Sequence, residues 1–373
     1  MAKKAYIGVN GIARKITKGY IGVGGIARKI KKAYIGIGGV ARPCFSSHIT
    51  SYWGELTYPE TRNYSGAGVI NNHALFAGGK SGDNYLSTVL TYDTSLTPKY
   101  ADDLSEARYY MGVATSNDRL FFGGGCIKSS SYGSSTCDAY NSSLSRTRLE
   151  TLQNVCEEPI GAGSQSFGFI AGGTYITQMS TVSAYSSNST TRHNAPNLST
   201  ATKATSTVGI NNLGSRAVFV DQDFVDAYDD SLTKTVGTLP KTPRNYISAT
   251  VFNGGAILAG GLINDGTFAG IECSDVDYMN TSLTCSSLEP LTYENYHVGA
   301  TTLGDYVLLG GKRGNIISET KTQLEAYDKN FTKVLGSDDY YVKYTIFYSA
   351  LSIGNYALFN EFDRTKVFEL TNN

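Results

Sequence analysis

The stretch ALFAGGKSGDNYLSTVLTYDTSLT, residues 74 to 97, decides the fold because its pattern returns along most of the chain. An apolar run ends in a Gly-Gly pair, a polar loop follows, and a second apolar run ends in Tyr-Asp and Ser-Leu-Thr. The pattern recurs about every 48 residues, which is the signature of a repeat architecture. The glycine-ended runs are at 76–79, 122–125, 170–173, 258–261 and 309–311, whereas the runs at 219–222 and 359–361 lack the glycines.

An aromatic residue ends the second run of each unit, which brings the count to seven. These residues are Tyr92, Tyr140, Tyr185, Tyr228, Tyr278, Tyr327 and Phe368. Units of this length with short strands resemble the kelch repeat, and the resemblance spans about residues 46 to 373. It implies that the glycines let strand backbones pack closely near an axis and that the aromatic side chain fills the space between blades. The predicted fold class is all-β: a seven-bladed kelch-like β-propeller.

The ends of the propeller segment are expected to meet in one blade. The last unit stops just after its third strand, so it lacks a fourth. Residues 49–57, which contain the only tryptophan, Trp53, match the outer strand of the kelch family. We therefore expect residues 49–57 to pair with residues 365–371 and to remove the open edge of the last blade.

Residues 3–44 carry a shorter repeat of 14 residues: KKAYIGVNGIARKI, TKGYIGVGGIARKI and KKAYIGIGGVARPC. Two apolar runs flank Asn-Gly or Gly-Gly, so each copy predicts a β-hairpin with Val9 opposite Ile12 and Ile7 opposite Arg14. A segment of about forty residues is only marginally stable alone. The arm, residues 1–45, is thus expected to attach to another protein or to oligomerise. Tandem YIGVGG-x-ARK repeats resemble those of tail-associated proteins of phages and prophages.

Charge separates the arm from the body. Residues 1–44 contain ten Lys or Arg and no acidic residue. Residues 45–373 contain the other 22 basic residues and all 32 acidic ones, so the arm is basic and the body is acidic. An acidic body argues against a nucleic-acid-binding propeller, although Tyr6, Tyr20 and Tyr34 among the basic residues leave a nucleic-acid-binding arm as an alternative.

Targeting signals and disulfide patterns are missing from the sequence. The chain has neither a signal-peptide core nor 18 consecutive apolar residues, so we expect synthesis in the cytoplasm and no membrane insertion. Six cysteines without a C-x-x-C pair are expected to be free thiols.

Signatures of catalysis are missing as well. His48, His73, His193 and His297 lie far apart in sequence without zinc-type spacing, and no G-x-S-x-G motif occurs. We therefore expect no catalytic residue, no metal and no cofactor. Carboxylate pairs for glycoside hydrolysis stay open, because a propeller brings distant residues together and nothing selects two of the 32 acids.

Binding is better supported by the loops. In kelch-like rings, the loops entering each blade and those between its second and third strands share a face that commonly holds ligands. Tyrosine on rigid loops suits stacking against sugars or peptides. The candidates are Tyr85, Tyr132, Tyr175 and Phe268 in the inner loops, and Arg62, Tyr64, Arg108, Tyr110, Arg244 and Tyr246 in the entering loops. An alternative makes the three arginines structural, each stacking between blades and bonding carbonyls of the neighbouring blade.

These observations lead to a functional prediction with two alternatives. We predict a non-enzymatic virion protein of a phage or prophage, whose arm binds other tail proteins, with homo-oligomerisation, and whose propeller binds a host-surface glycan or protein. One alternative is a sugar-processing propeller enzyme of the sialic-acid type. The other is an intracellular protein-interaction hub.

Overall fold

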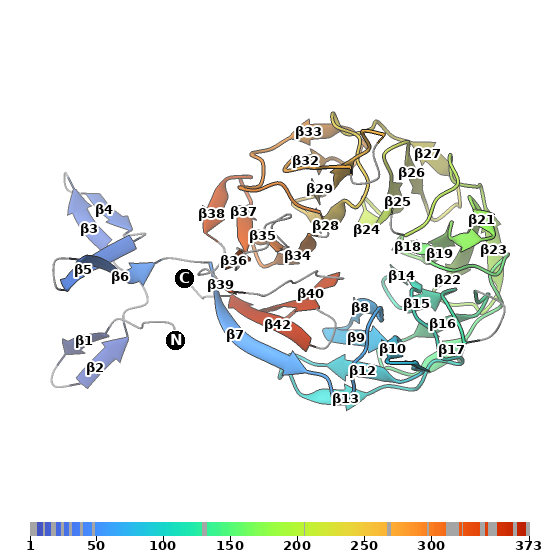
Figure 1. Cartoon of the computed structure of the whole chain (residues 1–373), viewed down its shortest axis with the longest axis horizontal. Helices are drawn as coiled ribbons and strands as arrows, with labels where there is room; N and C mark the ends of the chain where they lie inside the picture. Colours follow the sequence, from blue (N-terminus) through green and yellow to red (C-terminus); the bar gives the residue numbers. More distant parts are fainter. Residues whose placement is uncertain are drawn as a thin grey trace.

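The computed structural model describes residues 49–128, 133–204, 206–266, 270–296, 298–310, 324–335, 349–360 and 364–370, together with the backbone of strands in the arm and at 321–322 and 340–341. Seven four-stranded antiparallel sheets follow one another around a ring (Figure 1). The described residues contain strands, turns and bends but no helix, so none of them forms a helix that could cross a membrane. The predicted all-β, seven-bladed propeller is confirmed.

Each of the first six blades is built from consecutive strands, beginning with the innermost. Blade 1 contains β8 (Gly66–Ile70), β9 (His73–Ala77), β12 (Val89–Tyr92) and β13 (Pro98–Tyr100). Blade 2 contains β14 (Gly112–Thr115), β15 (Leu120–Gly123), β16 (Cys137–Tyr140) and β17 (Arg146–Arg148). Blade 3 contains β18 (Ile160–Gly163), β19 (Phe167–Ala171), β22 (Val182–Ser186) and β23 (Arg192–Ala195).

The second half of the ring repeats this order. Blade 4 contains β24 (Val208–Leu213), β25 (Arg216–Val220), β26 (Val225–Tyr228) and β27 (Lys234–Val236). Blade 5 contains β28 (Ser248–Phe252), β29 (Gly255–Ala259), β32 (Val276–Met279) and β33 (Cys285–Ser287). Blade 6 contains β34 (Gly299–Leu303), β35 (Tyr306–Gly310), β37 (Glu325–Asp328) and β38 (Lys333–Leu335).

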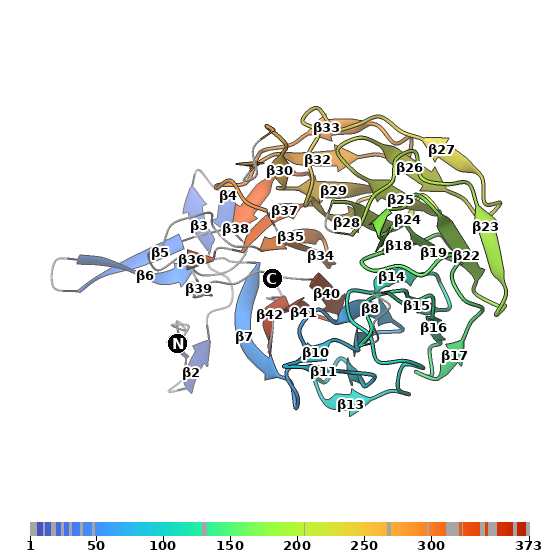
Figure 2. The ribbon, with the colours of Figure 1, turned by 45° about the vertical axis from the view of Figure 1, so that its right-hand side comes forward.

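Blade 7 joins the two ends of the propeller segment. It contains β40 (Ser349–Ile353), β41 (Tyr356–Asn360), β42 (Arg364–Leu370) and, outermost, β7 (Thr50–Thr57). The blue β7 lies beside the red β42 in Figure 1, and Figure 2 shows the same pairing from another side. Glu55 bridges two side chains of β42, with Oε2 at 3.0 Å from Arg364 Nη1 and Oε1 at 3.1 Å from Lys366 Nζ. The blade that closes the ring is thus held by a full ladder and two ion pairs.

Aromatic side chains of the third strands fill the spaces between blades. The rings of Phe169 in blade 3 and Tyr228 in blade 4 lie 5.4 Å apart in one such core. The buried phenols also donate to the connection from the preceding blade: Tyr140 to Asp102 O, Tyr185 to Glu150 O, Tyr228 to Pro196 O and Tyr327 to Glu289 O. The repeated tyrosine therefore fixes blades 2, 3, 4 and 6 to the blade before each of them.

Blade 5 departs from the predicted pattern. Tyr278 was expected in the interblade core, yet Met279 occupies that place: Met279 pairs with Ala256 as Tyr92 pairs with Ala74. Met279 is fully buried, whereas Tyr278 is partly exposed and donates to Asn253 O. One residue of offset along a strand moves a side chain to the opposite face of the sheet, which explains the misassignment.

The inner strands of blades 2, 3 and 4 approach one another closely. A Cβ on Gly163 of β18 would lie 1.9 Å from Thr115 O of β14, and one on Gly209 of β24 would lie 2.0 Å from Gly161 O. Asn211 of β24 also bonds both neighbours, because its Oδ1 accepts from Thr115 N at 2.9 Å and Gly163 N at 2.7 Å. These glycines are needed for backbone contact between blades.

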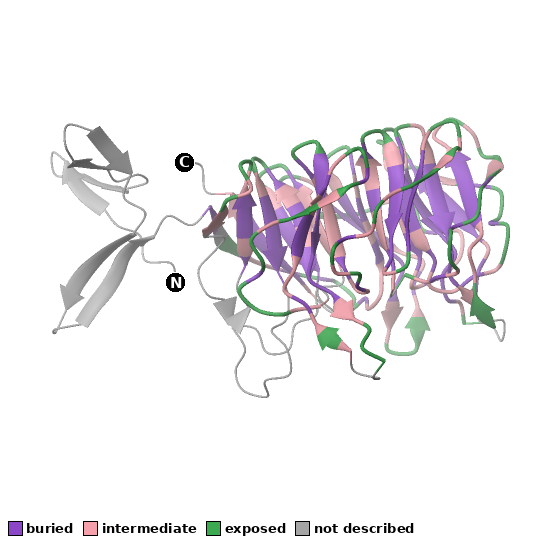
Figure 3. Ribbon diagram, turned by 90° about the horizontal axis from the view of Figure 1, so that it is seen from above, coloured by how far each residue is buried: buried purple, intermediate pink, exposed green. Residues whose placement is uncertain are grey.

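Short two-stranded hairpins extend from the ends of second and third strands. Three of them are β10 (Lys80–Ser81) with β11 (Asn84–Tyr85), β20 (Thr174–Tyr175) with β21 (Thr177–Gln178), and β30 (Leu262–Ile263) with β31 (Ile271–Glu272). A further pair joins β36 (Lys321–Thr322) to β39 (Tyr340–Tyr341). Figure 3, seen from above, shows buried residues in the blades and exposed residues mostly in the connections at both edges.

The arm forms three two-stranded antiparallel hairpins. They are β1 (Tyr6–Val9) with β2 (Ile12–Lys15), β3 (Tyr20–Val23) with β4 (Ile26–Lys29), and β5 (Lys32–Ile37) with β6 (Val40–Ser46). The register of the first pairs Val9 with Ile12 and Ile7 with Arg14, so the predicted hairpins are confirmed. The six predicted turn residues lie outside the described residues.

Candidate functional site

One edge of the ring combines two kinds of loop. We call the residues just before the first strand of a blade its entering segment, and the residues between its second and third strands its inner loop. An isolated bridge joins them in four blades: Asn63 with Lys80, Tyr109 with Cys126, Glu157 with Thr174, and Asn245 with Leu262. Both kinds of loop therefore lie at the same edge of each of these blades.

Hydrogen bonds between blades align the entering segments with one another. Amide groups of the inner-loop glycines donate to the first residue of the next segment: Gly79 N to Arg108 O, Gly125 N to Cys156 O, Gly173 N to Thr202 O and Gly261 N to Asn295 O. Third residues are also joined, Tyr110 N to Tyr64 O and Ala204 N to Glu158 O. This alignment gives first, second and third positions that can be compared around the ring.

The three predicted arginines occupy first positions, and their side chains are buried within their own blades. Arg62 is 1% exposed, and Arg108 and Arg244 are 0% exposed. Arg62 Nη1 donates to Phe76 O at 3.2 Å, Gly78 O at 3.1 Å and Thr88 O at 2.9 Å, and burial lowers the pKa of its guanidinium.

Arg108 and Arg244 add a buried carboxylate to such carbonyl contacts. Arg108 Nη2 lies 2.6 Å from Asp138 Oδ2, and Arg244 Nη1 lies 2.9 Å from Asp277 Oδ2. A buried guanidinium with these partners has no surface to offer a ligand. The structural interpretation of Arg62, Arg108 and Arg244 thus replaces the ligand-contact one, with a correction: the carbonyls bonded belong to the same blade rather than to its neighbour.

Four tyrosines of blades 1 and 2 lie close together, three in the entering segments and one in the inner loop of blade 1. The ring centroids of Tyr64 and Tyr110 are 4.4 Å apart, those of Tyr109 and Tyr110 are 5.0 Å apart, and those of Tyr85 and Tyr109 are 5.1 Å apart. All four side chains are partly exposed, and Lys80 Nζ lies 5.7 Å from the Tyr85 centroid. We call Tyr64, Tyr85, Tyr109 and Tyr110 the tyrosine cluster. Tyr109 was missed because a second-position tyrosine has no sequence signature.

Backbone strain accompanies the cluster. Tyr64 has φ 59° and Tyr110 has φ 54°, both in the left-handed region that a bulky residue rarely adopts. Such conformations cost about 1–3 kcal/mol each and persist where the surroundings fix them. The buried arginine at the first position of each of these segments supplies that support, because it ties the segment to its own blade.

Two carboxyl groups of blade 3 lie near Cys126, which contacts Tyr109 of the tyrosine cluster. Glu157 and Glu158 occupy the second and third positions, after Cys156, whose carbonyl accepts from Gly125 N of blade 2. Burial and then the Glu158 charge raise the pKa of Glu157, while Lys203 opposes them. Glu158 Oε2 lies 3.2 Å from Lys203 Nζ of blade 4. Nothing in the sequence distinguishes these two glutamates among the 32 acidic residues.

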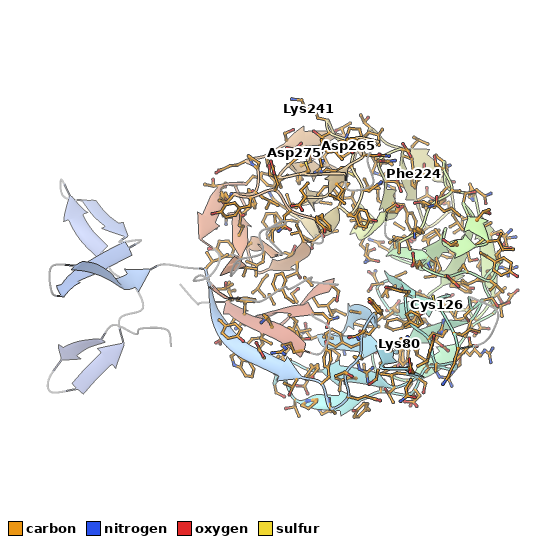
Figure 4. The ribbon with its side chains drawn as sticks, in the orientation of Figure 1. Lys80, Cys126, Phe224, Lys241, Asp265 and Asp275 are labelled. Carbon is orange, nitrogen blue, oxygen red and sulfur yellow. The ribbon has the colours of Figure 1, made fainter. Side chains whose placement is uncertain are left out.

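Cys126 links the carboxyl groups to the tyrosines. Its backbone amide donates to Tyr109 O at 2.7 Å, and its thiol pKa is raised to about 12, first by burial and then by the Glu157 charge. Figure 4 labels Cys126 and Lys80 in neighbouring blades. The five described cysteines are free thiols. The thiol of Cys126 is therefore neutral near pH 7 and serves as packing between the two sets of functional groups.

The remaining predicted residues are spread over other blades. Tyr246 of blade 5 lies 6.3 Å from Tyr296 of blade 6, ring centroid to ring centroid, and Tyr296 was not predicted. Tyr175 is 46% exposed on the hairpin of blade 3, next to the 90% exposed Ile176. Tyr132 and Phe268 lie outside the described residues. Of the predicted tyrosines, the structure brings together Tyr64, Tyr85 and Tyr110, and not Tyr175 or Tyr246.

No group of three or more His, Cys, Asp or Glu side chains in the described parts of the chain could hold a metal ion. His73 Nδ1 lies 2.9 Å from Asn71 O, and the ring of His193 packs 5.7 Å from that of Phe167. The described arrangement thus offers aromatic rings, two carboxyl groups and lysines as its chemistry.

Comparison with known proteins identifies the fold. No protein-family model matches the chain, and no curated protein matches its sequence. Among 598 solved chains that match the structure, a fungal alcohol oxidase of the AA5 family, in complex with copper, has a TM-score of 0.63 at 13% identity and covers 87% of this chain and 76% of that chain. YjhT has a TM-score of 0.55 at 12% identity and covers 75% of this chain and 99% of that one. At such identities the likeness shows a propeller fold and nothing finer.

These matches correct the predicted function. The non-enzymatic virion protein is not supported, because the similar structures include an alcohol oxidase, an enzyme, and the phage resemblance of the arm has no counterpart among the matches described. The expectation that the chain is not an enzyme is withdrawn for the same reason. A copper centre does not follow either, since the described residues contain no fitting set of donors.

Proposed function

We propose that the propeller is an acid–base enzyme that hydrolyses glycosidic bonds, with a sugar ring stacked on the tyrosine cluster. The observation that carries the proposal is the pair Glu157 and Glu158, which Cys126 connects to the tyrosine cluster and of which Glu157 has a raised pKa while Glu158 is paired with Lys203. A carboxyl group with a raised pKa and a second carboxyl group paired with a lysine can supply the general acid and the charge-stabilising group of glycoside hydrolysis.

The tyrosine cluster suits a sugar because a pyranose has an apolar C–H face and polar edges. Aromatic rings offer large area at a small cost in conformational entropy, since each tyrosine fixes only two side-chain angles. Burial raises the pKa of Tyr109, so its phenol stays protonated and can donate to a sugar oxygen. Lys80 adds a donor at the edge of Tyr85. Cluster and lysine together orient a sugar beside blade 3.

Glu157 is the proton donor in this proposal. Its raised pKa keeps the carboxyl group protonated to higher pH than in water, so it can transfer its proton to the leaving glycosidic oxygen as the bond from the anomeric carbon breaks. Glu158, which is ion-paired with Lys203, stabilises the positive charge that develops on the sugar. Water adds to the anomeric carbon and yields its proton to a carboxylate, which balances the reaction.

The three predicted arginines do not recognise a substrate carboxylate in this proposal. Recognition of a substrate carboxylate by Arg62, Arg108 and Arg244 would need accessible guanidinium groups, and all three are buried in their own blades. The cations near the site are Lys80, beside the Tyr85 ring, and Lys203, paired with Glu158. A neutral sugar fits this set better than an acidic one.

The test is turnover of a panel of p-nitrophenyl glycosides and polysaccharides by the full chain. Changing Glu157→Gln is expected to lower kcat about 10²–10⁴-fold, the usual contribution of a general acid. The control is Glu294→Gln, an exposed carboxyl group in the entering segment of blade 6. Wild-type activity should fall as pH rises through the raised pKa of Glu157, because the acid form is then lost. Equal activity of Glu157→Gln and wild type would overturn the proposal.

A further inference from the structure

The entering segment of blade 5 repeats that of blade 1. Arg244-Asn245-Tyr246 has the same three residues as Arg62-Asn63-Tyr64. Both arginines are buried, both asparagines form an isolated bridge with their own inner loop, and both tyrosines have positive φ, 55° and 59°. No other described entering segment has all three features.

The blade that follows supplies a tyrosine in the same place. Tyr109 and Tyr296 are both second-position residues, each directly after the residue whose carbonyl accepts from the second glycine of the preceding Gly-Gly pair, Gly79 or Gly261. The ring centroids of Tyr64 and Tyr109 are 6.2 Å apart, and those of Tyr246 and Tyr296 are 6.3 Å apart. Blades 5 and 6 thus reproduce the pair of rings on which the tyrosine cluster is built.

Two amide oxygens in these segments need hydrogen-bond donors. Asn245 Oδ1 and Asn295 Oδ1 are buried and have no hydrogen-bond partner among the described residues, although Asn245 Nδ2 donates to Gln222 Oε1 at 3.1 Å. A buried acceptor without a donor is costly, and a hydroxyl group is the simplest donor to satisfy it. The first site has no orphan of this kind at Asn63. Each oxygen belongs to the residue just before one of the two tyrosines, so a ligand hydroxyl bound at the rings is a candidate donor for it.

We propose that Tyr246, Tyr296 and the two asparagine oxygens form a second sugar-binding site, which holds a remote part of an oligosaccharide whose reacting end lies on the tyrosine cluster. The inference rests on the proposed function. Cys126 connects Glu157 and Glu158 of blade 3 to the first site, while blade 4 separates them from the second. The second site therefore binds without cleaving, and the substrate is a chain rather than a single sugar.

The chemistry of stacking narrows the substrate class. A pyranose ring presents a flat C–H face to an aromatic ring when its hydroxyl groups are equatorial, because axial hydroxyls would separate the two. The substrate class is therefore a chain of pyranoses with equatorial hydroxyls and equatorial linkages. Hexasaccharides of chitin, cellulose and xylan are suitable probes of this class.

Calorimetric binding of the three hexasaccharides and the matching disaccharides tests the proposal with the full chain and inactive Glu157→Gln as background. Tyr246→Ala is expected to weaken binding of at least one hexasaccharide about tenfold and to leave the disaccharide unchanged, since stacking contributes at that scale. Tyr246→Phe should keep the wild-type affinity. Tyr64→Ala should weaken both ligands. The matched control is Tyr100→Ala, which removes a 54% exposed tyrosine from outer strand β13.

The outcomes separate the two proposals. Unchanged hexasaccharide binding by Tyr246→Ala, equal losses for hexasaccharide and disaccharide, or no binding of any hexasaccharide by the wild type would each overturn the second site. Loss of hexasaccharide binding in Tyr246→Ala, with turnover that does not depend on Glu157, would keep the second site and remove the proposed reaction. Thermal unfolding of each variant shows whether the change acts on binding or on folding.

Discussion

Replacing Arg108 with methionine tests the assignment of the arginines most directly. The Arg108 guanidinium is fully buried in blade 2, where Nη1 donates to Gly124 O and Thr136 O, both at 2.8 Å, and Nη2 contacts Asp138 Oδ2 at 2.6 Å. Methionine keeps most of the side-chain volume and removes every one of these contacts. Asp138 would remain buried without its main cation.

The expected loss follows from the partners left behind. Removing one member of a buried ion pair costs about 3–5 kcal/mol, because the other charge stays uncompensated. Asp138 keeps weaker contacts with Arg146 Nη1 at 3.4 Å and Ser105 N at 3.2 Å, which limits the loss to about 4 kcal/mol. For a large domain, where 1 kcal/mol shifts Tm by about 2–4 °C, Tm should fall by roughly 10 °C.

The assay is a thermal scan of the wild type, Arg108→Met, Asp138→Asn and the double variant. The double variant should lose much less than the sum of the two single losses, because neither unpaired charge remains. Val236→Ala, a change at an exposed side chain on outer strand β27, is the control. A Tm within about 2 °C of the wild type in Arg108→Met, combined with weakened sugar binding, would refute the reasoning and return the arginine to the ligand site.

Two further predictions concern alkaline pH and the contact between inner strands. Burial raises the pKa of Tyr92 to about 12 and raises that of Tyr140 further, so the folded state keeps these phenols protonated, whereas in the unfolded state they ionise near pH 10. The free energy of unfolding, measured in urea, should therefore be constant below about pH 10 and fall as pH rises toward about 12. A flat profile between these two pH values would contradict the interblade role of the tyrosines. Gly163→Ala would place a Cβ 1.9 Å from Thr115 O and should lower the free energy of unfolding by more than about 3 kcal/mol in thermal unfolding. The control Gly82→Ala, whose Cβ meets nothing within 4 Å, should lower it by about 1 kcal/mol. Equal losses of stability would show that the inner strands can separate freely.

Local patterns predicted the architecture because they act over short stretches of chain. Asn-Gly and Gly-Gly between apolar runs predicted the arm hairpins, including the pairing of Ile7 with Arg14. The aromatic residue at the end of the second apolar run of each unit predicted seven blades. The same patterns misplaced Tyr278, because a one-residue offset within the unit is invisible to a count of repeats, and Met279 takes the buried position.

The glycine pairs were predicted as features of strand ends that allow close packing near the axis. The structure adds a second requirement for them. Gly78 has φ 60° and Gly79 has φ 105°, and a Cβ on Gly78 would lie 2.3 Å from Arg108 O of the next blade. The requirement is a left-handed backbone and a close approach by the following entering segment, in addition to packing near the axis.

The candidate site could be predicted only in part, because its members meet through contacts between blades. Tyr85 was singled out from its loop, yet Tyr109 completes the cluster across 24 residues of chain, and no motif marks it. The opposed environments of Glu157 and Glu158 depend on Lys203 in another blade. The repeat of Arg-Asn-Tyr is visible in the sequence. Only the structure shows that Tyr64 lies beside Tyr109 and that Tyr246 lies beside Tyr296.

Blade 7 also gives the chain a defined response to mechanical force. Residues 1–48 join the ring at β7, so tension on the arm reaches the Thr50–Leu370 pair before any other part of the ladder between β7 and β42. Tension directed across the sheet would separate the seven paired positions one after another, whereas tension along the strand would load them together. Glu55, which is ion-paired with Arg364 and Lys366, lies five residues further along β7 and would resist further separation of the two strands. A pull on the arm strong enough to pass that point would open the ring.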